Sequence, residues 1–172
     1  MERSLQDLAQ RLAAALEMVG TVTPVAPPGI YLTLTLSGAI YLVDVSNSDA
    51  PAVVTRHHSR HPLLHDSQPL PSVLDFRFDA TTGTGLVHWW KDDPGHYDDP
   101  TQPYTGTTRP TSPVLFVTRI RRPEQTPPAE VVDMLGEVLR AMEHPDAARV
   151  GLSSLPSGNE PSSRTDGGPH GR

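Results

Sequence analysis

The sequence contains no cysteine among its 172 residues, and Lys91 is its only lysine. Without cysteine the chain has no disulfide, no thiolate metal site and no thiol nucleophile. No run of apolar residues approaches the roughly 20 that a membrane-spanning helix needs. The first residues also lack the basic start and the apolar stretch of a secretory signal peptide. We therefore expect a cytoplasmic protein that does not associate with membranes.

Acidic residues outnumber basic ones and give a net charge of -6 at neutral pH. A charge of this sign disfavours a general affinity for nucleic acid or for anionic membranes. The length suits one domain with a sizeable core. The end of the chain is rich in Ser, Gly, Pro and charged residues. We expect a single domain over residues 1–156 and a disordered tail over residues 157–172.

Residues 72–91 form the stretch around which the rest of the fold is expected to assemble. Apolar and polar side chains alternate from Leu74 to Asp79, which is typical of a strand with one buried face. Small, turn-forming residues follow, and a second apolar run ends in Trp89 and Trp90. The pattern predicts a β-hairpin at the centre of the core. Of the two adjacent tryptophans, at most one faces that core.

Further strands are predicted over residues 30–45, 51–56 and 114–120. Residues 30–45 are interpreted as a second hairpin with a two-residue turn at Ser37 and Gly38. One face of this hairpin is then continuously apolar and buried. The other face is half-polar and is expected to be open, as in a sheet covered on one side. The apolar residues on that open face are Tyr31, Ile40 and Leu42.

Helices are predicted at both ends of the domain, over residues 4–19 and 127–143. The first begins at Ser4, a good N-cap, and carries leucines at helical spacing. The second contains Gly136, which costs a helix about 1 kcal/mol relative to Ala. We interpret this glycine as a point where another element packs closely. The predicted class is α+β: an antiparallel sheet of about five hairpin-connected strands with both helices on one face.

Histidines gather in the loop that precedes the aromatic hairpin. His57, His61 and His65 are spaced by four residues, which would align their imidazoles on a helix as metal ligands. Pro62 interrupts such a helix, and the loop has no HExxH motif. Solvated histidines on a polar loop are the more common outcome. A zinc site at these residues is therefore a secondary hypothesis.

A second polar cluster follows the tryptophans, where several aspartates accompany His96. Clustered carboxylates with a histidine can hold a divalent cation or act as acid and base. The spacing does not match an EF-hand, and Asp-Pro and Pro-Gly pairs are also common turn formers. Asp92 and His96 complete the set of candidate metal ligands with His57, His61 and His65. We otherwise expect no cofactor.

No nucleophile elbow, phosphate loop or β-lactamase-type motif occurs in the chain. The function we predict is a non-enzymatic protein-protein interaction module, such as a small adaptor, chaperone-like or immunity-like protein. Its partner is a different protein or a second copy of the chain. Exposed apolar surface usually marks such contacts. The predicted interaction surface consists of Tyr31, Ile40, Leu42, Trp89, Trp90 and Tyr97.

Two alternatives remain open. The first is a metal-assisted hydrolase, which requires the loop of His57–His65 to meet the loop of Asp92–Asp99. The second is a single-stranded nucleic-acid binder that stacks bases on Trp89 and Trp90 and binds phosphates through the arginines of residues 119–122. The net charge makes nucleic acid an unlikely partner.

Overall fold

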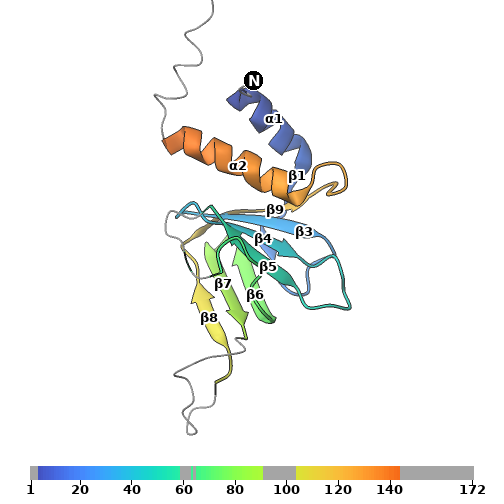
Figure 1. Ribbon diagram of the computed structural model, residues 1–172, viewed down its shortest axis with the longest axis vertical. Coiled ribbons are helices and arrows are strands. Elements are labelled where there is room, and N and C mark those ends of the chain that lie inside the picture. Colours follow the sequence, from blue (N-terminus) through green and yellow to red (C-terminus); the bar gives the residue numbers. More distant parts are fainter. Residues whose placement is uncertain (1–3, 59–62, 64, 91–103, 144–172) are drawn as a thin grey trace, which may run out of the picture.

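The computed structural model describes residues 4–58, 63, 65–90 and 104–143. This part of the chain contains two helices and nine strands arranged in three layers (Figure 1). The helices form one outer layer, a five-stranded sheet lies in the middle, and a four-stranded sheet forms the other outer layer. The helices are α1 (Leu5–Ala15) and α2 (Pro128–Glu143). Neither is long and apolar enough to cross a membrane.

The middle sheet has the strand order β1-β9-β3-β4-β5, and all its neighbours are antiparallel. Its strands are β1 (Leu16–Met18), β3 (Ile30–Thr35), β4 (Ile40–Asp44), β5 (Val53–His57) and β9 (Val114–Ile120). The predicted strand over residues 114–120 is confirmed and lies inside this sheet. Strand β5 forms an edge, which suits the proline that precedes it.

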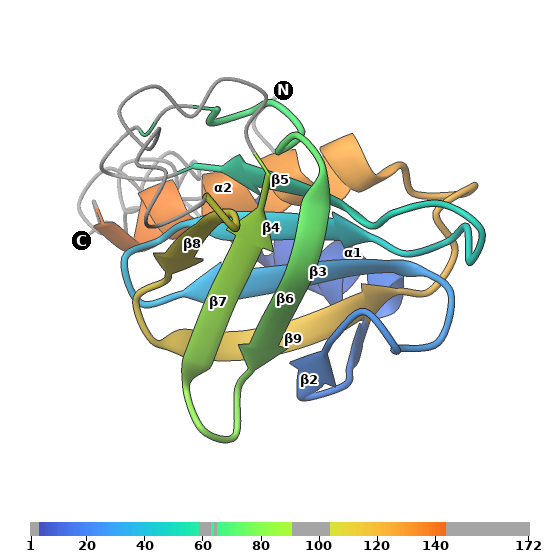
Figure 2. The same ribbon diagram turned by 90° about the horizontal axis from the view of Figure 1, so that it is seen from below.

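The outer sheet has the order β2-β6-β7-β8 and crosses beneath the middle sheet (Figure 2). Its strands are β2 (Thr21–Val22), β6 (Val73–Asp79), β7 (Thr84–Trp89) and β8 (Thr107–Pro110). The predicted aromatic hairpin is confirmed as β6 and β7. Trp89 is 2% exposed and Trp90 is 37% exposed, so one of the two tryptophans faces the core, as expected.

Two hydrophobic cores separate the three layers. The first lies between the helices and the middle sheet, and Leu8, Leu32, Ile40 and Val131 are among its buried residues. The second lies between the two sheets and contains most of the aromatic side chains. Its aromatic members are Tyr31, Tyr41, Phe76, Phe78 and Trp89. The α+β class and the helices on one face of a sheet are confirmed, and the second sheet is an addition to the predicted arrangement.

The register of β3 and β4 differs by one residue from the prediction. Leu34 pairs with Ile40, and the turn has three residues, with Gly38 at φ +79°. A shift of one residue exchanges the two faces of a strand relative to its neighbour. Tyr31 therefore faces the outer sheet, while Ile40 and Leu42 face the helices. The predicted open face of the sheet is wrong, because both faces of the middle sheet are covered.

The first helix is shorter than predicted. Ser4 caps it as expected, accepting a hydrogen bond of 3.1 Å from the backbone N–H of Asp7. The helix ends at Ala15, and Leu16–Met18 instead pairs with β9 as strand β1. The leucine spacing alone favours a longer helix, but the unpaired edge of β9 provides backbone partners that override this local preference. The expected tail over residues 157–172 lies outside the described residues.

Candidate functional site

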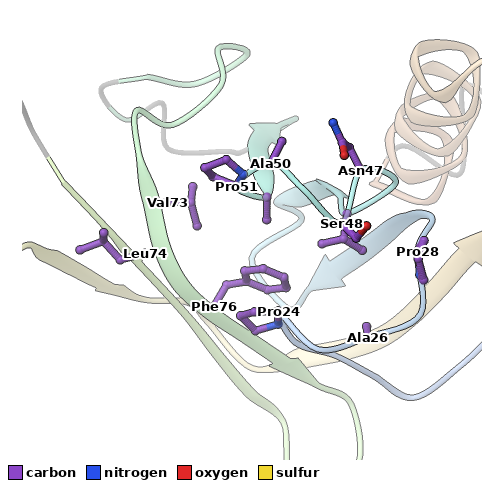
Figure 3. Close-up of a pocket in the computed structure, with 12 residues that line it drawn as sticks. Pro24, Ala26, Pro28, Asn47, Ser48, Ala50, Pro51, Val73, Leu74 and Phe76 are labelled. Carbon is purple, nitrogen blue, oxygen red and sulfur yellow. The ribbon is translucent and has the colours of Figure 1, made fainter.

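A groove opens where the segment before β3, the turn after β4 and the start of β6 meet (Figure 3). Its volume is about 360 Å³. We call it the proline-lined groove, because three prolines contribute to its walls, two from the segment before β3 and one from the segment before β5. Its residues are Pro24, Ala26, Pro28, Val45, Asn47, Ser48, Ala50, Pro51, Ala52, Val73, Leu74 and Phe76.

Among the described residues no charged side chain lines this groove, and Asn47 and Ser48 are the polar ones. Phe76 is 1% exposed, whereas Leu74 is 52% exposed and accessible from solvent. The groove therefore offers apolar contact area with two polar groups. This composition suits the binding of an apolar group.

Hydrogen bonds hold the walls of the groove in place. The Tyr31 hydroxyl donates to the carbonyl oxygen of Pro27 over 2.6 Å, which anchors the segment before β3. In the turn after β4, side-chain oxygens of Asp44 and Asn47 accept hydrogen bonds from backbone N–H groups two residues later. Such side chain–backbone bonds stabilise one loop conformation. The groove is thus largely preformed, and little order has to be gained when it is occupied.

The described residues of the predicted interaction surface lie in different parts of the fold. Tyr31, Ile40 and Trp89 are at most 2% exposed, and they belong to two different cores. Leu42 is partly buried against the helices. Trp90 remains partly exposed, and its ring lies 4.6 Å from that of Tyr104. Tyr97 lies outside the described residues.

The candidate metal ligands are described only in part. His57 lies on β5 and is half-buried, and His65 adopts a left-handed backbone at φ +70°. His61, Asp92 and His96 lie outside the described residues, so the meeting of the two loops stays a prediction. Within residues 4–58, 63, 65–90 and 104–143, no group of three His, Cys, Asp or Glu side chains could hold a metal ion. Burial, and to a lesser degree the charge of His58, lowers the pKa of His57.

Two of the arginines of residues 119–122, Arg121 and Arg122, lie away from Trp89. Arg121 donates to the backbone oxygen of Leu16 over 3.0 Å, beside the end of α1. Arg121 and Arg122 line a second hollow of about 440 Å³ with Arg11. Trp89 lies in the core between the two sheets, on the other side of the middle sheet. Arg119 pairs with Tyr31 and so lies on the face that looks toward the outer sheet, and the nucleic-acid alternative stays a prediction.

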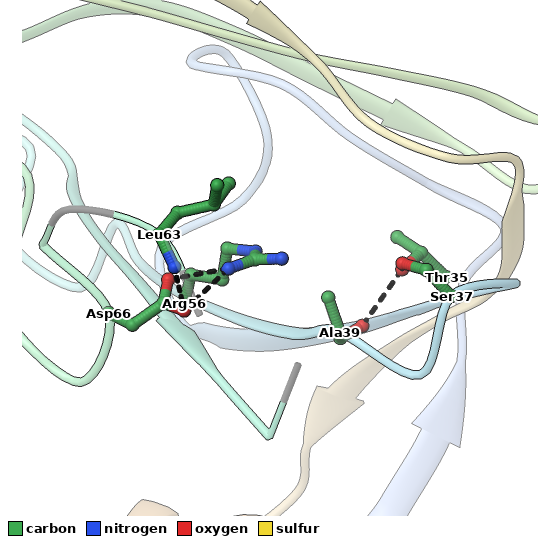
Figure 4. Close-up of polar contacts among 6 residues, drawn as sticks. All are labelled: Thr35, Ser37, Ala39, Arg56, Leu63 and Asp66. Carbon is green, nitrogen blue, oxygen red and sulfur yellow. Dashed lines mark hydrogen bonds and ion pairs between the residues drawn. The ribbon is translucent and has the colours of Figure 1, made fainter. Parts of the chain in front are cut away.

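One ion pair between the sheets, formed by Arg56 and Asp66, was not predicted from the sequence. Arg56 is 5% exposed, and its Nη1 lies 2.6 Å from both carboxylate oxygens of Asp66 (Figure 4). Asp66 also accepts a hydrogen bond of 2.8 Å from the backbone N–H of Leu63. The alternation of Val54 and Arg56 in the predicted strand places both on one face. That pattern was the available signal for a buried arginine.

No protein-family model matches this chain, and it matches no curated protein and no solved structure. Its function is therefore argued from the chemistry of the groove and of the residues around it.

Proposed function

We propose that this protein is a non-enzymatic protein-binding module, and that the proline-lined groove receives an uncharged, apolar segment of its partner. The observation that supports this proposal is the lining of the groove. Among the described residues, its three prolines, Phe76 and six aliphatic or alanine neighbours surround two polar side chains. A charged partner segment would lose hydration there without gaining an ion pair.

The size of the groove fits one or two apolar side chains. Burying a side chain such as Leu, Val or Phe contributes about 1.5–3 kcal/mol. Two such side chains contribute about 3–6 kcal/mol, which is less than the roughly 8.2 kcal/mol of a micromolar complex. The groove alone therefore supports weak binding, and only if the protein loses little freedom on association. Proline has a fixed φ angle, and the anchored walls are already ordered. These features keep the loss of conformational entropy on binding small.

Side-chain insertion is a better mode of binding than strand addition. The edge strand β5 is partly covered by the following loop, where Thr55 bridges to Pro69 and Arg56 bridges to Asp66. In the outer sheet, β2 has two residues and β8 ends at Pro110. Short edges and prolines of this kind discourage the pairing of a further strand. The groove offers the partner apolar contact without such pairing.

The proposal is tested with two leucines of similar exposure. Leu74 lines the groove and is 52% exposed, whereas Leu115 on β9 is 50% exposed and is not among the groove residues. A displayed peptide library is selected on the wild-type protein, and the enriched peptides are titrated by calorimetry against Leu74→Asp and Leu115→Asp. We expect uncharged peptides whose affinity falls at least tenfold with Leu74→Asp and is unchanged with Leu115→Asp.

Three outcomes would contradict the proposal: no enriched peptide, enriched peptides that carry mainly charged residues, or equal binding to both variants. Thermal unfolding of each variant checks that the fold is retained. Light scattering at several concentrations shows whether a second copy is the partner. A dimer that dissociates with Leu74→Asp and persists with Leu115→Asp would assign the groove to self-association.

A further inference from the structure

Arg109 is a half-buried cation for which the described residues provide no ionic partner. It lies on β8 opposite Val87 of β7, and cross-strand partners point to the same face of a sheet. Since Val87 is fully buried between the two sheets, the side chain of Arg109 is directed into that space. Its guanidinium lies 4.9 Å above the ring of Trp89. Within the described residues its Nη1 is buried and has no hydrogen-bond partner.

A second orphan donor belongs to Trp89, the residue under this guanidinium. Trp89 is 2% exposed, and its indole N–H finds no acceptor in the described part of the chain. A buried donor without a partner destabilises the folded protein, and a buried charge without one does so more strongly. Two such donors on residues in direct contact are rarely left unmatched in a native protein, and they indicate a missing acceptor.

A second arginine, Arg56, lies near Arg109 and increases the positive charge between the two sheets. Arg56 pairs with Tyr41 across β4 and β5, so both residues share the face that looks toward the outer sheet. Burial raises the pKa of Tyr41, while the charges of Arg56 and Arg109 oppose this rise. The charges of both guanidinium groups therefore reach the hydroxyl group of Tyr41. Asp66 is engaged by Arg56 at 2.6 Å, and no ion pair to Arg109 is found among the described residues.

We propose that Arg109 and Trp89 together bind a carboxylate group through their two unpartnered donors. The guanidinium would bind one or both carboxylate oxygens, and the indole N–H would donate to one of them. A carboxylate is favoured over a phosphate because a phosphate has more oxygens to satisfy than the two orphan donors can serve. Arg109 is half-buried, so the ligand enters along its exposed side.

This site shares no residue with the proline-lined groove, and the inference does not depend on the proposed function. The carboxylate is either that of a small organic acid or the C-terminus of a peptide. Both sources present the same planar group to Arg109. They differ in size, so the experiment includes one probe of each kind.

The test uses the two indole N–H signals of the full chain, since the protein has two tryptophans. Succinate, a short uncharged peptide with a free C-terminus, the same peptide with an amidated C-terminus, and inorganic phosphate are titrated in separate NMR experiments. We expect the Trp89 signal to move with a carboxylate probe and the signal of the exposed Trp90 to serve as the internal reference. Arg109→Gln should abolish the movement, whereas Arg140→Gln on the exposed face of α2 should not.

A response to succinate assigns the site to small organic acids, and a response to the free peptide alone assigns it to a C-terminus. The proposal is overturned if neither probe moves the Trp89 signal at millimolar concentration. It is also overturned if the amidated peptide or phosphate acts equally well, or if Arg109→Gln responds like the wild type. Arg109→Lys, which keeps the charge but loses the planar fork, should weaken binding at least fivefold and provides a second variant should Arg109→Gln fold poorly.

Discussion

The imidazole of His58 lies directly against Gly136 of α2. A Cβ atom at position 136 would be 2.7 Å from Cε1 of His58 and 2.9 Å from both ring nitrogens. These distances are too short for van der Waals contact, so the glycine leaves room for the ring. Asp133, one turn earlier on the same helix, has its carboxylate 4.0 Å from the His58 ring. The interpretation of Gly136 as a point of close packing is confirmed.

Substituting Gly136→Ala should therefore give no gain in stability, although Ala favours a helix by about 1 kcal/mol. Displacing the His58 ring should offset that gain. In a His58→Gly background the same substitution should stabilise the protein by about 1 kcal/mol. Urea denaturation of the four proteins of this double-mutant cycle measures the coupling. Equal effects of Gly136→Ala in both backgrounds would show that the ring does not restrict this position.

Asp66→Ala should lower the free energy of unfolding by about 3–5 kcal/mol, because it leaves Arg56 charged and buried without its carboxylate. Adding Arg56→Met to this variant should recover part of the loss. The control is Glu130→Gln, which removes a half-exposed ion pair with Arg11 and should cost less than about 1 kcal/mol. Chemical denaturation compares the three variants. A loss for Asp66→Ala no larger than that of the control would refute the buried pair as a stabilising contact.

The pH dependence of stability should include a contribution from His57. Burial lowers the pKa of this imidazole below its ordinary value of 6.5. Below pH 6.5 the unfolded chain therefore binds more protons than the folded protein. The free energy of unfolding consequently decreases as the pH is lowered. The fall ends once the pH is below the folded-state pKa. His57→Gln should show a smaller loss between pH 8 and pH 5, and an NMR titration midpoint for His57 at or above 6.5 would contradict this prediction.

Gly85 and Gly83 should respond differently to substitution. A Cβ atom at Gly85 would lie 3.0 Å from Val114 Cγ2 and 3.1 Å from Thr111 Cβ, so Gly85→Ala should destabilise by about 1–3 kcal/mol through overpacking. A Cβ atom at Gly83 would make an ordinary van der Waals contact, 3.8 Å from Pro113 Cβ, but the backbone there has a φ of +70°. Asn tolerates that backbone, so Gly83→Asn should cost less than about 1 kcal/mol. Thermal unfolding of both variants tests this order, and the reverse order would be inconsistent with the packing at Gly85.

Local patterns predicted the elements that carry strong signals of their own. The cap at Ser4, the strand over residues 114–120 and the aromatic hairpin all follow from side-chain chemistry or alternation within a few residues. Because successive side chains of a strand point to opposite faces, the sequence also predicted that only one of the two adjacent tryptophans faces the core. The second helix begins at the predicted prolines and ends at Glu143.

Other features depend on partners that are distant in the sequence. Strands β1, β2 and β8 have two to four residues each and are defined by pairing with β9, β6 and β7. The turn at Gly38 was one residue longer than predicted, which reversed the assignment of Tyr31 and Ile40 to their faces. The groove draws Pro24, Pro51 and Leu74 from three loops and strands, and no short motif marks such a set.

The position of β9 has a consequence for how the chain folds. Leu16 pairs with Ile120, and Val22 pairs with Phe78. Segments near the start of the chain therefore pair with strands that lie far along the sequence and are synthesised later. Closing such long loops is slow, and proteins rich in non-local pairing fold on the slower side of the two-state range. During synthesis, the β3–β4 hairpin would be complete long before its neighbour β9 leaves the ribosome. We expect refolding to be limited by the docking of β9, so Val117→Ala should slow refolding more than Leu8→Ala at equal loss of stability.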